Sequence, residues 1–186
     1  GRRAALLPAA ALLAAGHTAG EAQAKTVEVS EKDLKRIAAG YKDLKYLMDN
    51  WNKVTRDCTA VDANTQQVLA AGVESPDMCK ATPDVVRKYM GMRSIDGNLF
   101  NTQQLWISIQ QTDLVAGKDD DRFADAVEDF EKAKRQASEW AYNSSWGEAN
   151  PGGGRDKVED YLLRSKKEAA KATEALGVIV DVLRLA

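Results

Sequence analysis

The chain has 186 residues, of which 44% are hydrophobic and 29% charged, and its formal net charge is −2. This length fits one compact domain, and the apolar fraction excludes an intrinsically disordered chain. The near-neutral charge excludes a dedicated nucleic-acid-binding protein, because such a protein needs a basic excess to attract phosphates.

The first 24 residues are expected to form an export signal. The pair Arg2-Arg3 precedes an apolar stretch from Ala4 to Ala15, and a small-x-small site follows at Ala22-Gln23-Ala24. These are the parts of a signal that is cleaved after its last small residue, and paired arginines are typical of the twin-arginine route. As a helix the apolar stretch would extend about 18 Å, which is too short for a bilayer core of about 30 Å. The alternative is an alanine-rich amphipathic or disordered tail.

From Ser30 to about Arg56 the apolar residues recur at steps of three and four. This spacing lines one side of a helix, and Ser30 followed by Asp33 is typical of a capping box. The apolar stripe consists of Leu34, Ile37, Tyr41, Leu44, Met48 and Trp51.

Cys58 and Cys79 are the only cysteines, and the 20 residues between them have a loop-like composition. In an exported protein, two cysteines predict one disulfide. The sequence contains no CxxC redox motif, no CxxCH haem motif and no histidine–cysteine cluster for zinc. A structural disulfide is therefore expected, and closing a loop of this size contributes about 3 kcal/mol to stability.

Two helices are expected after this loop and before residue 116. A short one begins at Thr82 and Pro83, an N-cap residue followed by proline at the first helical position, and ends near Gly91. A longer one covers about 101–115. Its inward residues are Leu105, Ile109 and Leu114, with Trp106 at one edge.

Two further helices complete the expected fold. The third long helix follows the acidic run 119–121, which favours a helix N-terminus, and ends before the loop 146–154, which is rich in glycine and contains a proline. The fourth has apolar and small residues at steps of three and four, and the small ones allow a neighbouring helix to come close. The two stripes are Phe123, Val127, Phe130, Ala133, Ala137, Trp140 and Ser144 in the third helix, and Val158, Leu162, Ser165, Ala169, Ala172, Leu176, Ile179 and Leu183 in the fourth.

These elements predict an all-α fold. No long segment alternates with period two, so a sheet is not expected. The long helices predict a four-helix up-down bundle over residues 25–186, with a long disulfide-containing excursion between the first two of them.

The sequence provides little for catalysis or metal binding. Its one histidine, His17, lies in the expected leader, so no set of nucleophile, base and orienting group can be assembled. A di-metal carboxylate bundle would need Glu-x-x-His pairs, which are absent. Gly152-Gly153-Gly154 before a helix could hold phosphate, but the lysine and hydroxyl of a P-loop are missing, so a plain loop is favoured. We expect no enzyme activity, no catalytic residue, no metal site and no cofactor.

Trp146 lies outside the apolar stripes, in the expected loop between the third and fourth helices. A large aromatic residue in a loop is either a cap folded over the end of the bundle or an anchor inserted into a partner. The sequence leaves both interpretations open.

Two segments carry a family resemblance, together with the leader motifs and the two cysteines: VVRKYMGMRSIDGNLF at 85–100 and SSWGEANPGGG at 144–154. They resemble the PsbQ-like extrinsic proteins of photosystem II, and most of all the additional lumenal subunit of diatoms and other red-lineage algae. The resemblance extends over about 34–182, where the helices are matched by pattern alone.

The resemblance implies a four-helix protein of the chloroplast thylakoid lumen, peripheral to the membrane and docked on photosystem II core subunits and other extrinsic lumenal proteins. Such subunits are non-enzymatic, help to retain calcium and chloride near the manganese cluster, and stabilise the oxygen-evolving complex. The alternative is a lumenal or membrane-anchored structural subunit of photosystem I or of an antenna supercomplex, with or without contact to pigment. The contact residues expected within the two segments are Tyr89, Arg93, Phe100, Trp146, Glu148, Asn150 and Pro151.

Overall fold

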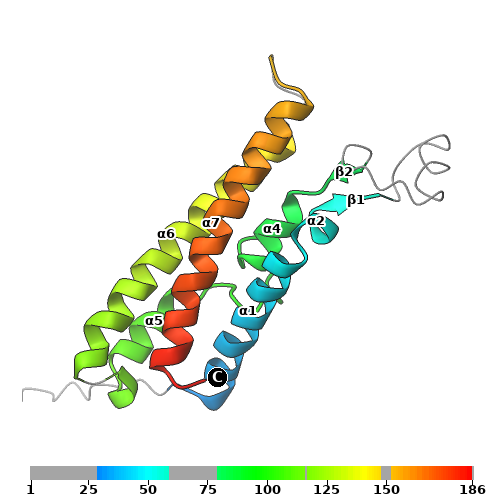
Figure 1. Cartoon of the computed structure of the whole chain (residues 1–186). Helices are drawn as coiled ribbons and strands as arrows, with labels where there is room; N and C mark the ends of the chain where they lie inside the picture. Colours follow the sequence, from blue (N-terminus) through cyan, green and yellow to red (C-terminus); the bar gives the residue numbers. More distant parts are fainter. Residues whose placement is uncertain (1–28, 59–78, 116, 148–151, 186) are drawn as a thin grey trace, which may run out of the picture.

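The computed structural model describes residues 29–58, 79–115, 117–147 and 152–185, and this part of the chain is mostly helical. The two longest helices, α6 and α7, lie side by side and run in opposite directions, and α1 lies alongside them (Figure 1). No helix in these ranges is long and apolar enough to cross a membrane. The expected leader, residues 1–24, lies outside them. The elements are α1 (Glu31–Asp49), α2 (Trp51–Val54), β1 (Arg56–Asp57), β2 (Lys80–Ala81), α4 (Asp84–Tyr89), α5 (Gln103–Gln110), the 3-10 turn η2 (Asp113–Val115), α6 (Lys118–Trp146) and α7 (Arg155–Val182).

Small residues and buried serines join α6 to α7. The Ser165 hydroxyl of α7 donates a hydrogen bond of 2.7 Å to the Ala137 carbonyl of α6. Nearer the connecting turn, the Ser144 hydroxyl donates one of 2.9 Å to the Val158 carbonyl. Such bonds from a side chain to a neighbouring helix backbone require the two helices to approach closely. This confirms the expectation for α7, whose predicted stripe is buried along its length except for the half-buried Leu183.

Helix α1 begins as predicted but ends earlier. Its capping box is present, because the Ser30 hydroxyl accepts from the Asp33 backbone N–H and the Asp33 carboxylate accepts from the Ser30 N–H. The predicted continuous helix to Arg56 is wrong, because α1 ends at Asp49 and the four-residue α2 follows. The Asn50 side chain donates to the Tyr46 carbonyl at this break. A short polar side chain that bonds the backbone in this way competes with helix continuation.

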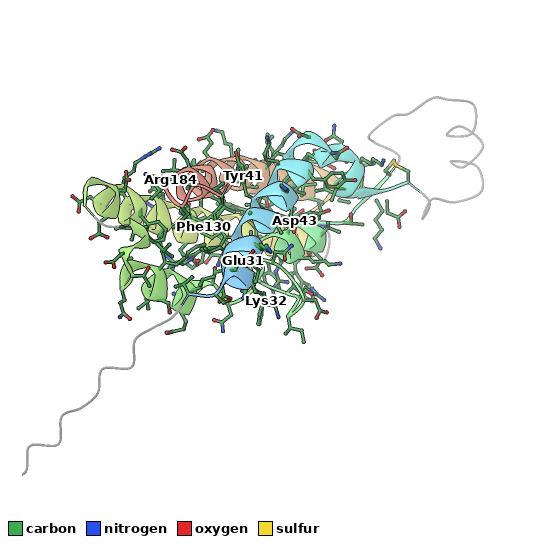
Figure 2. The ribbon with its side chains drawn as sticks, turned by 90° about the horizontal axis from the view of Figure 1, so that it is seen from below. Glu31, Lys32, Tyr41, Asp43, Phe130 and Arg184 are labelled. Carbon is green, nitrogen blue, oxygen red and sulfur yellow. A yellow bond between two sulfur atoms is a disulfide. The ribbon has the colours of Figure 1, made fainter. Side chains whose placement is uncertain are left out.

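The buried face of α1 packs on α7. Ile37 and Leu44 are fully buried, and Tyr41 lies against α7 (Figure 2). Gly177 of α7 makes room for Tyr41, because a Cβ atom at that glycine would lie 3.1 Å from the tyrosine hydroxyl oxygen.

The predicted helix over 101–115 is shorter than expected. Helix α5 has eight residues, and Leu114, which was expected to face inward, is exposed in the following 3-10 turn. Helix α4 packs against α1 and α6, and α5 packs against α6. The predicted helix over 101–115 is therefore divided into α5 and the 3-10 turn η2, and α4 takes the place of the short helix predicted before it.

The burial of two tryptophans is the reverse of the prediction. Trp106, placed at an edge by the sequence pattern, is 2% exposed and contacts Phe123 and Phe130 edge-on. Its indole N–H donates a 2.8 Å hydrogen bond to Glu131, which allows the polar end of the ring to be buried. Trp140, expected in the core, is half-buried and stacks on Tyr161.

A buried polar network holds α5 against α6. One carboxylate oxygen of Glu131 accepts from Trp106, from the Thr102 hydroxyl at 3.2 Å and from the Lys134 ammonium at 2.9 Å. The Lys134 side chain is almost fully buried. Because a buried charge is costly unless it is paired, Glu131 is the residue on which this network depends.

A disulfide and a two-stranded ladder lie at the end of α2. Arg56 pairs with Ala81 and Asp57 with Lys80, antiparallel, so the expectation of no sheet is wrong for these four residues. The predicted disulfide between Cys58 and Cys79 is present, directly beside the ladder (Figure 2). Helix α4 begins soon after it, with Pro83 at the N-cap, one residue later than predicted.

Replacing Glu131 by alanine is expected to lower the free energy of unfolding by about 3 kcal/mol, because the Lys134 charge would stay buried without its partner. Urea unfolding measures this loss. Glu128→Ala, an exposed position one turn earlier on α6, is the matched control and should change little. Equal, small losses for both variants would contradict the importance of the network.

Reduction of the Cys58–Cys79 disulfide is expected to lower the free energy of unfolding by about 3 kcal/mol, because the unfolded chain gains the freedom of the opened loop. The urea midpoint with and without a dithiol reductant tests this. A Cys58→Ser/Cys79→Ser variant should start at the lower midpoint and not respond to reductant. A wild-type midpoint that is insensitive to reduction would contradict the prediction.

Candidate partner-binding surface

Trp146 lies on the last turn of α6 and not in the connecting loop as predicted. The helix continues through this residue because the Ser144 side chain is buried between α6 and α7, and it stops at Gly147. A Cβ atom at Gly147 would lie 2.9 Å from the Val158 side chain, so a glycine here lets the start of α7 approach. Trp146 itself is 52% exposed. Its ring is not folded into the core of the described residues.

Trp146 belongs to a surface that combines aromatic rings with an arginine. Its ring meets that of Tyr142, one helical turn earlier, edge-on with centroids 6.2 Å apart. The Arg87 guanidinium of α4 lies 5.2 Å from the centre of the Tyr142 ring, within the range of a cation–π contact. Met92 is exposed nearby, on the same cavity as Arg87 and Tyr142. We call Arg87, Met92, Tyr142 and Trp146 the aromatic–arginine patch.

A shallow cavity of about 480 Å³ opens in this patch between α4 and α6. Its apolar wall comes from Met92 and the Tyr142 ring, and polar groups line the rest. A mixture of aromatic, methionine and arginine side chains around such a cavity is typical of protein interfaces. The complete lining is Arg87, Met92, Arg135, Ser138, Glu139, Tyr142 and Asn143.

Arg93, a predicted contact residue, joins the patch through Asp84. The Asp84 carboxylate pairs with both the Arg93 and the Arg87 guanidinium groups, the latter at 3.1 Å. One carboxylate thus holds two arginines, and the arrangement has a net positive charge. It also fixes the position of Arg87 over Tyr142.

Tyr89, another predicted contact residue, lies apart from the patch, on a second cavity of about 380 Å³ toward α1. Asp43, Lys88 and the residues 94–98 line it with Tyr89, except for Ile95. Burial is the main cause that raises the pKa of the Tyr89 hydroxyl, and the neighbouring Tyr46 and Asp43 add to the effect. Of the predicted contact residues, Tyr89 therefore lines the second cavity, whereas Trp146 and Arg93 lie at the patch.

Phe100 is half-buried, and the contact it makes with α1 is through its backbone. Its carbonyl accepts a hydrogen bond from the Arg36 guanidinium. The other predicted contact residues, Glu148, Asn150 and Pro151, lie outside the described residues. A role in partner binding stays a prediction for all of them.

The sequence interpretation missed Arg87, Met92 and Tyr142. Tyr142 is four residues before Trp146, a spacing that places both on one side of a helix. The predicted loop beginning at Trp146 concealed this relation. Arg87 and Met92 stand in the segment that carries the family resemblance, but only the fold brings them to Tyr142.

No cluster of three or more histidine, cysteine or acidic side chains that could hold a metal ion is found in the ranges that the structure covers. His17, the one histidine of the sequence, lies outside those ranges. The described surface presents aromatic rings and arginines that a partner could contact.

Comparisons of the chain with protein-family models, with curated proteins and with solved structures found no match.

Tyr89 offers a test of the second cavity by pH. Because the pKa of Tyr89 is raised in the fold, its contribution to stability is complete below the unfolded value of about 10 and is lost as the pH rises through the folded pKa. The ultraviolet absorbance of tyrosinate, wild type minus Tyr89→Phe, should therefore titrate above pH 10. The same difference in denaturant should titrate at about 10, and equal midpoints in the two conditions would argue against the burial of this hydroxyl.

Proposed function

We propose that this chain is a non-enzymatic extrinsic subunit of photosystem II. It docks on core subunits and other extrinsic proteins at the lumenal side of the thylakoid membrane through the aromatic–arginine patch. The observation that carries the proposal is the exposed Trp146–Tyr142 pair with the Arg87 guanidinium over the Tyr142 ring.

The composition of the patch supports docking. Tryptophan, tyrosine and arginine dominate the residues whose loss most weakens protein–protein binding. The Tyr142 ring meets the Trp146 ring edge-on and lies under the Arg87 guanidinium, which is itself paired with Asp84, so little side-chain freedom would be lost on binding. The patch is supported by α6, whose packing against α7 fixes its position.

The disulfide supports the proposed compartment. Disulfides form and persist in oxidising environments and are rare in reducing ones, and Cys58–Cys79 is formed in this chain. The thylakoid lumen is the compartment proposed, on the resemblance of the leader and of the two segments to lumenal extrinsic proteins. In the same proposal, α4 and α5 together take the place of one helix in a four-helix up-down bundle, as in the PsbQ-like proteins.

The proposed action is mechanical. A rigid helical body, held at the lumenal face by its patch, covers the oxygen-evolving complex and slows the loss of calcium and chloride without binding either ion.

The decisive experiment is rebinding to photosystem II particles that have been stripped by a salt wash. The wild-type chain should rebind and restore oxygen evolution at limiting calcium and chloride. Trp146→Ala should weaken rebinding about tenfold or more, since it removes the largest exposed ring of the patch. Its thermal midpoint should stay close to that of the wild type, because the ring is half exposed.

Leu163→Ala is the matched control, because Leu163 is a large apolar residue of α7 that is 63% exposed and outside the patch. This variant should rebind like the wild type. Rebinding of Trp146→Ala with unchanged affinity would refute the role of the patch. Binding of the wild type to photosystem I or antenna particles, and not to photosystem II, would refute the proposed location and favour the alternative subunit.

A further inference from the structure

Residues 91–100 form a loop whose two ends lie against each other. Gly91 has a φ of +68°, and a Cβ atom there would lie 2.3 Å from the Leu99 carbonyl group. Only glycine permits both this conformation and this approach. A compact loop of this length with adjacent ends is an Ω-loop, a form that is often functional.

Helix α1 fixes the returning half of this loop. The Arg36 guanidinium donates to the Asn98 carbonyl at 2.8 Å and to the Phe100 carbonyl. The Asn98 side chain donates to the Asp43 carboxylate at 2.8 Å. The backbone of the loop is thus held in place from one side without belonging to a helix or a sheet.

Leu99 adds an apolar attachment to these polar ones. Its side chain is buried against Gly40 of α1, where a Cβ atom would lie 2.4 Å from a Leu99 methyl carbon. The attachment therefore requires both the leucine and the glycine. The Leu99–Gly40 contact, the Arg36 hydrogen bonds and the close approach at Gly91 are three separate interactions that fix the loop.

Ile95 lies at the tip of the loop and is 79% exposed, more than any other large hydrophobic side chain in the described residues. It occupies a tight turn in which the Gly97 N–H donates to the Ser94 carbonyl at 3.2 Å. Turns favour glycine, proline and short polar residues. A single exposed apolar residue on a helix is ordinary. Ile95, in contrast, is a β-branched residue on a turn, in a loop that Gly91, Arg36 and Leu99 hold in place. It departs from the local preference of turns, and such departures are characteristic of functional positions.

The loop tip adjoins the aromatic–arginine patch. Met92, at the start of the loop, lines the cavity of the patch. Ser94 and Asp96, on either side of Ile95, line the second cavity with Tyr89. Ile95 is therefore flanked in the chain by two residues of the second cavity and lies three residues after Met92 of the patch, which docks in the proposed function.

We propose that Ile95 is an anchor that inserts into an apolar socket of the partner protein, and that a partner carboxylate beside this socket pairs with Arg93. The proposal rests on the proposed function and names the chemistry of the partner surface. Asp84 is the one carboxylate among the described residues that forms a salt bridge with Arg87 or Arg93, so the two guanidinium groups carry an excess positive charge. Arg93 is more than half exposed, so its guanidinium is accessible to a second carboxylate.

A protein socket fits this loop better than a lipid surface. Surfaces that bind membranes reversibly combine several apolar side chains with a basic excess. Here one isoleucine stands between Arg93 and the acidic Asp96, with Met92 as the only other large apolar side chain of the loop tip. One side chain held on a fixed backbone is instead typical of an anchor that fills a pocket.

The test measures the affinity of the full-length chain for salt-stripped photosystem II particles. Ile95→Ala should weaken binding about tenfold or more, and Ile95→Val should weaken it much less, because most of the apolar volume remains. Leu163→Ala, at a similarly exposed leucine on α7, should bind like the wild type. Arg93→Gln should weaken binding and make it less sensitive to salt.

The outcomes separate the two proposals. If the wild type binds and Ile95→Ala binds equally well, the anchor is refuted and the docking function stands. If the wild type does not bind at all, both are refuted. Vesicles of phosphatidylcholine with phosphatidylglycerol test the lipid alternative. Binding of the wild type to these vesicles that is lost in Ile95→Ala would refute the protein socket. Equal thermal midpoints for the variants and the wild type would show that the fold is unchanged.

Discussion

The close approach of α6 and α7 is the constraint on which the rest of the structure depends. Small residues recur in the buried stripes of both helices, and two serines, Ser144 and Ser165, direct their hydroxyls at the backbone of the opposite helix. A larger side chain at these positions would separate the helices and leave these hydroxyls and carbonyls unpaired. The resulting two-helix body is the support on which α1, α4 and α5 pack.

This support also explains where the patch lies. Tyr142 and Trp146 come near the end of α6, where Ser144 bonds to α7 and Gly147 leaves room for Val158, so their rings project from a helix that is held by α7. Helix α4 packs on the same part of the molecule and contributes Arg87. Aromatic rings on a braced helix end and an arginine held by an ion pair form a surface that changes little in shape when a partner binds.

Periodicity in the sequence was enough to identify α1, α6 and α7, because long amphipathic stripes have few alternative explanations. The capping box at Ser30 and the disulfide were predicted for similarly local reasons. The segment between the disulfide and α6 was harder to predict. The burial of Trp106 depends on Glu131, which lies 25 residues away, and the position of residues 91–100 depends on Arg36 and Gly40 of α1. No short-range pattern encodes such contacts. The patch was predicted only in part, because Arg87 and Tyr142 meet through the fold.

The attachment of residues 91–100 to α1 has a consequence for the rate of association. A loop that is ordered before binding has no conformational search to complete when it meets a partner, and its ordering entropy is already lost on folding. Encounter is then close to rigid-body docking, and its rate is governed by diffusion, orientation and the attraction between opposite charges. Side chains on α1 that never touch a partner, such as Arg36, would in this way influence how quickly the partner is captured.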